Sequence, residues 1–390
     1  MNEDVMSVQE VSPVYEFVAE HPALPVGYKQ TEIGVIPESW ESIRIDQHAV
    51  IKTGGKNTQD KIEDGLFPFF VRSQQVERIN SYSYDGEAVL TAGDGVGTGK
   101  VFHYINGKFD VHQRVYRISE FSTELDGRYF FYQFSSHFYD RIMSMTAKSS
   151  VDSVRMEMIA GLQIPLPPRP EQHAIANALS NMDALLEELD RLIAKKRDIK
   201  RAAMQQLLTG ETRLPGFEGE WETQQIGDVL EVHHGRNQKE IETKDGEYPI
   251  YASGGEIGRA DTYLYSKPSV LIGRKGTIDA PRYCDQPFWT VDTLFYTELI
   301  DNNSAKFMYY KFCMIPWRNY NEASGVPSLS ARTIENIKIV LPNYEEQEAI
   351  AAALSDIDTE TQALEQRRSK TAELKQGMMQ ELLTGRTRLV

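Results

Sequence analysis

Two glycine-rich segments combine charged residues with the backbone freedom that close approach to a phosphate or a base requires. The first, Gly93–Lys100, reads GDGVGTGK, and the second, Ile272–Gly276, reads IGRKG. The first does not match a phosphate-binding P-loop, which needs glycine at Asp94 and serine or threonine at Val101. It also fails the dinucleotide fingerprint, whose third glycine would fall at Thr98. Both segments are therefore predicted to be turns at which the backbone approaches another group closely.

The remaining reactive residues do not show the spacing of a catalytic or metal site. His233 and His234 are adjacent, so on a strand they would point to opposite faces and could not share an ion. The two cysteines, Cys284 and Cys313, are too few for a disulfide framework or a cysteine-built zinc site. An Asn-Pro-Pro-aromatic motif, the acidic motif of a nuclease and a Gly-x-Ser-x-Gly elbow are all missing. The sequence therefore predicts a protein that is not an enzyme by itself.

The chain contains one unit written twice. Residues 164–180 return as 339–355, and residues 204–214 return as 379–389, both at an offset of 175. Upstream, Trp40 pairs with Trp221 at an offset of 181. The repeat indicates a variable globular region followed by a better-matched segment, each present in two copies.

The better-matched segments are predicted to be long helices that form a coiled coil. A seam with alternating spacings of four and three runs through Ile175, Leu179, Met182, Leu186, Leu189 and Ile193, and through Ile350, Leu354, Ile357, Thr361 and Leu364. Such a seam suits two helices packed on each other. Pro170 and Pro342 are expected just before the starts, and Gly210 and Gly385 after the ends. Roughly 36 helical residues would span about 55 Å.

The variable regions are predicted to be mixed α/β domains. Residues 88–91, 269–273 and 336–341 have strand character, and glycine clusters interrupt such runs. Residues 125–145 and 305–317 indicate helices rich in Tyr, Phe and Met. Irregular sheets with long loops are therefore expected on either side of the helical segments.

Composition restricts the class of protein further. The 390 residues include 42 basic and 57 acidic side chains, a formal net charge of −15, so bulk positive charge cannot drive binding to nucleic acid. No apolar run approaches the roughly 18 residues of a membrane span. The N-terminus, Met-Asn-Glu-Asp, is acidic where a secretory signal would be basic, so the cytoplasm is the expected compartment.

Three motifs resemble the specificity subunit of type I restriction–modification systems. They are Leu-Pro-Pro-x-x-Glu-Gln before Ala-Ile-Ala-x-Ala-Leu-Ser, Gln-x-Leu-Leu-Thr-Gly-x-Thr-Arg-Leu closing the same segment, and Gly34-Val-Ile-Pro-Glu-Ser-Trp40. The resemblance runs from about Tyr28 to Val390, and it is strong in the helical repeats and weak inside the variable regions. The first thirty residues show no resemblance that can be named.

The resemblance implies an architecture, a function and a set of partners. Each variable region would be a target recognition domain reading one half of a split, asymmetric site in double-stranded DNA, and the long helices would pair antiparallel and fix the separation of the two domains. Two methylation subunits would dock on the helices and bring S-adenosylmethionine and the catalytic residues. Motor-nuclease subunits would bring ATP and Mg, so this chain would bind no cofactor itself.

The expected fold is therefore α+β, with two mixed α/β recognition domains, two long antiparallel coiled-coil helices and an internal pseudo-twofold repeat. The expected division is an acidic N-terminal extension (1–29), a first recognition domain (30–168), a first long helix (169–213), a second recognition domain (214–343) and a second long helix (344–390). The extension is expected to be either a short helix that closes the particle or a disordered segment.

Base reading is expected from individual side chains near the matched glycine turns, because the chain as a whole is acidic. Arginine suits guanine edges, asparagine and glutamine suit adenine, and lysine suits phosphate. The candidate DNA-binding residues are Lys52, Lys56, Arg72, Gln74, Gln75, Lys100 and Arg114 in the first domain, and His234, Arg236, Asn237, Lys239, Ser253, Arg259, Arg274 and Lys275 in the second.

Two other classes of protein would explain part of the sequence. A non-DNA adaptor, with two binding modules on a coiled-coil spacer, would account for the repeat, the helices and the acidity. A self-contained nuclease or methyltransferase is disfavoured by the missing motifs. A split adenine-methylation motif in a host that expresses the chain with its partner would support the DNA-reading interpretation.

Overall fold

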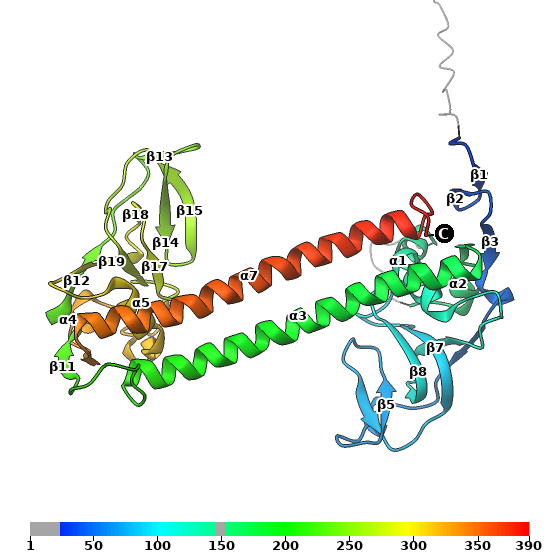
Figure 1. Ribbon diagram of the computed structural model, residues 1–390, viewed down its shortest axis with the longest axis horizontal. Helices are drawn as coiled ribbons and strands as arrows, with labels where there is room; N and C mark the ends of the chain where they lie inside the picture. The colour runs from blue at the N-terminus through cyan, green and yellow to red at the C-terminus, as the bar shows by residue number, and fades with distance from the viewer. Residues whose placement is uncertain (1–23, 146–152, 390) are drawn as a thin grey trace, which may run out of the picture. The chain divides into compact units, whose positions relative to one another are not determined.

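The computed structural model describes residues 24–145 and 153–389, which divide into two compact units. Within these ranges, unit 1 consists of the residues up to 185 and from 371 onward, and unit 2 consists of residues 186–370. Each unit contains one variable region together with part of both long helices, α3 (Arg169–Thr209) and α7 (Tyr344–Leu382) (Figure 1). Most of the expected N-terminal extension, residues 1–23, lies outside the described residues.

Unit 1 is built around a six-stranded mixed sheet. Its order is β4-β9-β7-β8-β5-β6, in which β5 and β8 are parallel and all other neighbours are antiparallel. The strands are β4 (Val50–Thr53), β5 (Phe67–Phe70), β6 (Glu77–Ile79), β7 (Tyr84–Ala92), β8 (Phe102–Val111) and β9 (Val115–Ser119). Both faces of β7 are buried, because Val89 joins the main core while Ala88 and Leu90 join a second cluster on the opposite face.

Smaller elements close unit 1 around this sheet. They are the hairpin β1 (Tyr28–Thr31) and β2 (Gly34–Pro37), the antiparallel pair β3 (Glu41–Arg44) and β10 (Gln163–Leu166), the 3₁₀ turns η1 (Ile45–Gln47) and η2 (Thr58–Asp60), and the helices α1 (Gly127–Met145) and α2 (Met156–Ala160). In α1, Phe130, Phe134 and Phe138 recur every four residues and are fully buried in the core. The same core includes Leu179 of α3 and Leu382 of α7, so both long helices pack on this unit.

Unit 2 repeats this architecture with its sheet divided into two. One part has the order β12-β19-β16-β17 and the other the order β13-β15-β14-β18. The strands are β12 (Leu230–His234), β13 (Glu242–Thr243), β14 (Tyr248–Ala252), β15 (Gly255–Ala260), β16 (Ser269–Gly273), β17 (Arg282–Cys284), β18 (Trp289–Thr290) and β19 (Leu294–Leu299). The parallel pair β14–β18 repeats β5–β8, so the counterpart of β8 is interrupted between Cys284 and Trp289.

The remaining elements of unit 2 complete its architecture. They are the antiparallel pair β11 (Glu222–Gln225) and β20 (Lys338–Leu341), the helices α4 (Ile226–Val229), α5 (Ala305–Met314) and α6 (Ala331–Glu335), and the 3₁₀ turn η3 (Trp317–Tyr320). Helix α5 is shorter than the predicted 305–317, because Pro316 disfavours helical geometry in the residue before it. Ser304 begins the helix by accepting a hydrogen bond from the Phe307 amide.

The two long helices run antiparallel. In unit 2, Asp190 of α3 pairs with Arg368 of α7 at 2.9 Å, and Lys200 of α3 pairs with Asp358 of α7 at 2.6 Å. Residue numbers rise along one helix as they fall along the other, which confirms the predicted antiparallel arrangement. The helices contain 41 and 39 residues, compared with the roughly 36 helical residues expected from the seam, and α3 begins with Pro170 already inside its first turn. A proline is tolerated there because the first amides of a helix have no intrahelical acceptor.

A buried glutamate in unit 1 joins the segment after α7 to the first turn of α3. Glu171 is 2% exposed and accepts hydrogen bonds from Arg388 Nε at 2.6 Å and from Trp40 Nε1 at 2.9 Å. Tyr28 adds a hydrogen bond to the Gly385 carbonyl oxygen at 2.9 Å. The carboxylate is thus neutralised and hydrogen-bonded, as a buried charge must be.

Unit 2 contains the same arrangement with the helices exchanged. Glu346, in the first turn of α7, is fully buried and accepts hydrogen bonds from both Nε and Nη2 of Arg213 at 2.5 Å. Trp221 Nε1 donates to the same carboxylate at 3.2 Å. Trp221 and Trp40, which are paired in the sequence repeat, therefore have the same role in three dimensions, which confirms the internal repeat.

Candidate nucleic-acid interface

In unit 1, the glycine-rich turn after β7 gathers two arginines from other segments. Asp94 Oδ1 accepts a hydrogen bond from Arg72 Nη1 at 2.8 Å, and Asp94 Oδ2 accepts one from Arg114 Nη1. Arg72 follows β5 and Arg114 precedes β9. Burial alone would raise the pKa of Asp94, but the hydrogen bonds from the two arginines bring it below its ordinary value. Asp94 is therefore an ionised carboxylate that holds both guanidinium groups at the turn.

The turn can approach the arginines this closely because it is made of glycine. A Cβ at Gly97 would lie 2.4 Å from the carbonyl oxygen of Arg72, and a Cβ at Gly93 would lie 3.0 Å from the carbonyl oxygen of Arg114. Gly95 has φ +79°, a conformation that other residues rarely adopt. The group that this turn approaches closely is therefore the backbone of two neighbouring loop segments of the same domain.

A buried histidine supports the backbone of one of these arginines. His112 is 4% exposed, and its Nδ1 accepts a hydrogen bond from the Arg114 amide at 3.0 Å. Burial first, and then the positive charge of Arg72, lower the pKa of His112 below its ordinary value. The ring is consequently neutral near pH 7 and keeps the lone pair that the Arg114 amide requires.

Further candidates of the first variable region lie near this turn. Lys56 forms an isolated parallel bridge with His112. Lys100 is exposed at the end of the glycine-rich turn, with its Nζ 5.9 Å from the centre of the Tyr139 ring. The loop that follows β5 begins at Arg72 and also contains two exposed glutamines, Gln74 and Gln75.

Lys52 is the candidate of this region that the structure places elsewhere. It projects from β4, where its Nζ lies 3.8 Å from a carboxylate oxygen of Glu120. The structure therefore brings Arg72 and Arg114 into direct contact with one acid and leaves Lys52 in a separate surface ion pair.

In unit 2, the corresponding turn carries its own cations. The Arg274 amide donates to the Thr293 carbonyl oxygen at 2.9 Å, and the Leu329 amide donates to the Arg274 carbonyl oxygen at 2.9 Å. Lys275 forms an isolated antiparallel bridge with Ser328. Arg274 and Lys275 thus lie between the segment before β19 and the segment before α6.

The same backbone pattern occurs in unit 1 around Gly93 and Asp94. The Gly93 amide donates to the Arg114 carbonyl oxygen at 2.8 Å, and the Val154 amide donates to the Gly93 carbonyl oxygen at 2.7 Å. Asp94 forms the matching bridge with Ser153. The first region therefore has glycine and aspartate where the second region has arginine and lysine.

Other candidates in unit 2 surround the same turn. Arg274 Nη1 donates to the carbonyl oxygen of Asp292 at 3.0 Å, and the Arg236 amide donates to the Thr290 carbonyl oxygen at 2.8 Å. Ser253 lies beside Gly276, where an added Cβ would meet its Oγ at 3.1 Å. The structure thus brings these candidates to one edge of the region, namely Arg236, Ser253, Arg274 and Lys275.

The remaining candidates of the second region lie on neighbouring segments. His234 ends β12 with its ring edge-on to Phe295 at 4.9 Å. Asn237 and Lys239 share the following loop, in which Asn237 Oδ1 accepts from the Lys239 amide at 3.0 Å. Arg259 lies on β15 and pairs with Glu256 at 3.1 Å, so it is occupied within its own strand.

Sequence reasoning missed the acid and the histidine that organise the first turn. In the sequence, Asp94 is only a mismatch to a phosphate-binding pattern, although an acidic residue inside a glycine run near basic residues is itself a signal for an ion pair. His112 carries no local signal, because its role depends on the pairing of β5 with β8.

Neither a metal cluster nor a membrane helix occurs in the part of the chain that the structure describes. In residues 24–145 and 153–389, no three His, Cys, Asp or Glu side chains are arranged to hold a metal ion. Within the same ranges, no helix is long and apolar enough to span a membrane.

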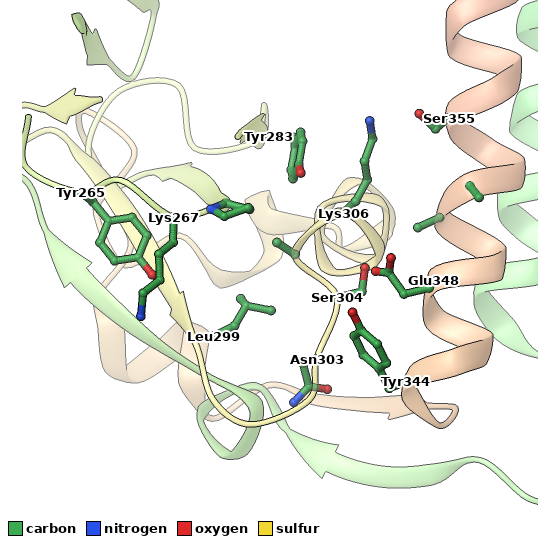
Figure 2. Close-up of a pocket in the computed structure, with 14 residues that line it drawn as sticks. Tyr265, Lys267, Tyr283, Leu299, Asn303, Ser304, Lys306, Tyr344, Glu348 and Ser355 are labelled. Atoms are coloured by element: carbon green, nitrogen blue, oxygen red, sulfur yellow. The ribbon is translucent and has the colours of Figure 1, made fainter. Parts of the chain in front are cut away.

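Unit 2 also contains a cavity of about 490 Å³ at the first turns of α7 (Figure 2). Tyr283 and Lys306 line it from the variable region, with the Lys306 Nζ 5.0 Å from the centre of the Tyr283 ring. Tyr344, Glu348 and Ser355 line it from α7. The cavity is distinct from the glycine turn of this unit, because none of the candidate DNA-binding residues lines it.

Comparisons with known proteins agree with this architecture. A family model described as the type I restriction modification DNA specificity domain matches residues 37–195 and 218–376. The type I restriction enzyme MjaVIII specificity subunit of Methanocaldococcus jannaschii is 22% identical, over 91% of this chain and 94% of the relative. The putative MjaX specificity subunit of the same organism is 26% identical, over 93% and 97%.

Solved structures share the fold. The crystal structure of a type I S subunit from M. genitalium has a TM-score of 0.69 at 19% identity, covering 88% of this chain and 96% of that one. A structure titled for complex assembly and conformational transition of a type I restriction–modification system has a TM-score of 0.53 at 15% identity, covering 90% and 99%. These similarities confirm the predicted α+β fold with two mixed domains and long helices.

The two matches of one domain model lie at the two copies of the sequence repeat, and the relatives are specificity subunits. The predicted resemblance is therefore confirmed, as is the expectation of a non-catalytic component. The chain belongs to the family of type I restriction–modification DNA specificity domains, of which it contains two copies in one non-catalytic specificity subunit.

Proposed function

We propose that each recognition domain reads one half of a bipartite, asymmetric site in double-stranded DNA. The observation that carries the proposal is the matched turn, which has the same backbone hydrogen bonds in both units but different side chains. Gly93 and Asp94 in the first domain correspond to Arg274 and Lys275 in the second. The same backbone geometry with two different sets of polar side chains suits two different half-sites, since base identity is read by side-chain donors and acceptors.

We also propose that the long helices hold the domains at a fixed separation along the DNA. Helices of 41 and 39 residues would each span about 60 Å at 1.5 Å per residue. DNA presents the same groove again about every 34 Å. The recognition domains would be residues 30–168 and 214–343, with helical segments 169–213 and 344–390.

The partners would supply the chemistry that this chain lacks. Two methylation subunits would dock on the long helices and bring S-adenosylmethionine and the catalytic residues. Motor-nuclease subunits would bring ATP and Mg, and the chain itself would bind no cofactor. The complex would act in the cytoplasm, and its partners would add contacts to the DNA backbone that a chain of net charge −15 does not favour.

The docking proposal takes account of which alanine-rich helix positions are accessible. Ala176 and Ala351 are each 3% exposed and belong to the cores of their own units, so they cannot receive a partner. Asn177 and Ala352 are exposed at equivalent positions, 175 residues apart. We propose that they mark two equivalent docking surfaces.

Methylome sequencing tests the proposed function. A host that expresses the chain with its methylation partner should acquire a split adenine-methylation motif. A complex that binds its partner but gives no methylation motif would instead favour the non-DNA adaptor.

Arg274→Ala should relax or abolish only the half-site read by the second domain. Its guanidinium lies at the matched turn and its loss would remove base or phosphate contacts there, at a cost of about 1–3 kcal/mol in discrimination if it reads a base. The matched control is Arg318→Ala, which removes an exposed arginine that pairs with Asp279 in the same domain. An unchanged motif would remove Arg274 from the interface.

A further inference from the structure

We infer that Asp94 is a positioning residue that holds Arg72 and Arg114 for reading guanine in the half-site of the first recognition domain. The inference rests on the proposed function, and it assigns a base and a set of reading groups to one of the two domains. Asp94 is acidic, so a search of the sequence for basic DNA-binding side chains would not find it.

The two guanidinium groups keep most of their donors available. Each contributes one Nη1 hydrogen bond to Asp94, and no other hydrogen bond from either guanidinium occurs among residues 24–145 and 153–389. The side chains of Arg72 and Arg114 are 41% and 59% exposed. A guanidinium has five N–H donors in a planar fork, so the edge formed by Nε and Nη2 stays open on both. This edge matches the O6 and N7 acceptors of guanine.

The carboxylate is itself held firmly. Asp94 is only 21% exposed, and its backbone is anchored by the bridge to Ser153. The arginine backbones are anchored as well, because Gly93 donates to the Arg114 carbonyl and the turn packs on the Arg72 carbonyl at Gly97. Two flexible side chains are thereby restrained before DNA arrives, which reduces the entropy lost on binding.

The combined charge of Asp94, Arg72 and Arg114 favours the reading of a base over the binding of a phosphate. Asp94 cancels one of the two positive charges and would repel a phosphate within a few ångströms. The directed N–H groups of the arginines remain, and these are what distinguish guanine from other bases. In the second domain, Lys275 replaces the acid at the equivalent position, so the two domains would not read the same base in the same way.

The first test compares methylation motifs of complexes assembled with the methylation partner. The half-site that survives in Arg274→Ala is assigned to the first domain, and it should contain guanine. Arg72→Ala and Arg114→Ala should each lower discrimination at a guanine position by about tenfold or more, with the other half-site unchanged.

Asp94→Asn separates the positioning role from simple charge. It should relax the same guanine positions, while binding to unrelated duplex DNA does not fall, because a negative charge has been removed. The matched control is Asp46→Asn, which removes an acid paired with Arg44 at 2.6 Å in the same domain and should leave the motif unchanged.

Arg72→Lys and Arg114→Lys keep the inference testable if Asp94→Asn does not assemble. Lysine keeps the charge and loses the planar fork, so guanine reading should fall by about tenfold while a phosphate contact would persist. The inference is overturned by a first half-site without guanine, or by lysine variants that keep the motif. Absence of any split motif in the unmodified complex would instead refute the proposed function.

Discussion

Gln133 in unit 1 and Lys311 in unit 2 occupy equivalent positions, and each donates a hydrogen bond to a backbone carbonyl near the end of a long helix. One donor is a neutral amide and the other is an amine. Gln133 Nε2 donates to the Leu383 carbonyl oxygen at 2.7 Å in unit 1, and Lys311 Nζ donates to the Leu208 carbonyl oxygen at 2.6 Å in unit 2. Burial lowers the pKa of Lys311 to about 8. An amide carries no such pH dependence, so the two units should respond differently to alkaline conditions.

Lys311 should contribute to unit 2 a stability that rises with pH between about 8 and 10.4. An unfolded lysine titrates near 10.4, so in this window the unfolded chain binds more protons than the folded one. The contribution of Lys311 to the free energy of unfolding should increase by about 2 kcal/mol across the window, allowing for the partial exposure of the amine. Because cysteines and tyrosines of the same unit have raised pKa values and titrate with the opposite sign, denaturant unfolding at several pH values would measure this rise as the difference between the unmodified chain and Lys311→Gln.

Lys311→Gln should remove that rise, because it gives unit 2 the neutral donor that unit 1 already has. The control is Lys338→Gln, which removes an exposed lysine of the same unit and should leave the dependence intact. If Lys311→Gln keeps the same slope, another group is responsible.

The sequence allows individual basic side chains to be selected as candidates, but it does not reveal the residues that they contact. Five arginines are expected at the interface because basic residues stand out beside glycine turns, namely Arg72, Arg114, Arg236, Arg259 and Arg274. Asp94 is not among the expected residues, because its significance depends on two arginines that are 22 and 20 residues away and come together through strand pairing. Whether the candidates touch DNA stays a prediction.

At the level of secondary-structure elements, a buried glutamate in the first turn of α3 and another in the first turn of α7 attach the start of each helix to neighbouring segments of its unit. Glu171 and Glu346 each accept hydrogen bonds from an arginine and a tryptophan of other segments. Removing one partner of a buried ion pair costs more than the pair is worth, since the remaining charge loses its compensation.

Glu346→Ala should destabilise unit 2 by about 2–4 kcal/mol. The effect should lie toward the lower end of this range, because Arg213 is partly exposed and can be solvated by water when the carboxylate is lost. Urea unfolding of the purified chain would measure the loss. Glu188→Ala is the matched control, since Glu188 forms an exposed pair with Arg191 within α3 and its loss should cost less than about 0.5 kcal/mol. Equal effects of the two substitutions would contradict the structural role of Glu346.

The long helices could be predicted from the sequence, but the order of the strands within the sheets could not. The seam residues are spaced locally along the chain, and Ile175, Leu179, Leu189 and Leu354 are buried as that spacing requires. Strand order has no local signature, because β5 finds its parallel partner β8 more than thirty residues further on. The interruption of the corresponding strand in unit 2 at 285–288 is equally invisible in the sequence.

At the scale of the whole molecule, the duplicated docking surface predicts stoichiometry. Ala352→Arg should prevent one methylation subunit from binding and Asn177→Arg the other, because burying a long charged side chain without a partner at either contact is costly. Mass measurement of the co-expressed complex should give two methylation subunits for the unmodified chain and one for each variant.

The double variant should bind no methylation subunit. The matched control is Gln362→Arg, which places the same charged side chain at an exposed position of α7 away from the proposed surface and should leave both subunits bound. A stable one-to-one assembly of the unmodified chain would contradict the two equivalent surfaces.

Unit 1 is completed by residues far along the chain, since Leu382, Leu383 and Arg388 pack against residues that precede them by more than 200 positions. During synthesis, the ribosome must therefore deliver the residues up to about Arg388 before the recognition domain of unit 1 can be completed. Unit 2 is contiguous and has no such delay. A premature stop codon that spares residues 186–370 would thus harm the reader that was translated first.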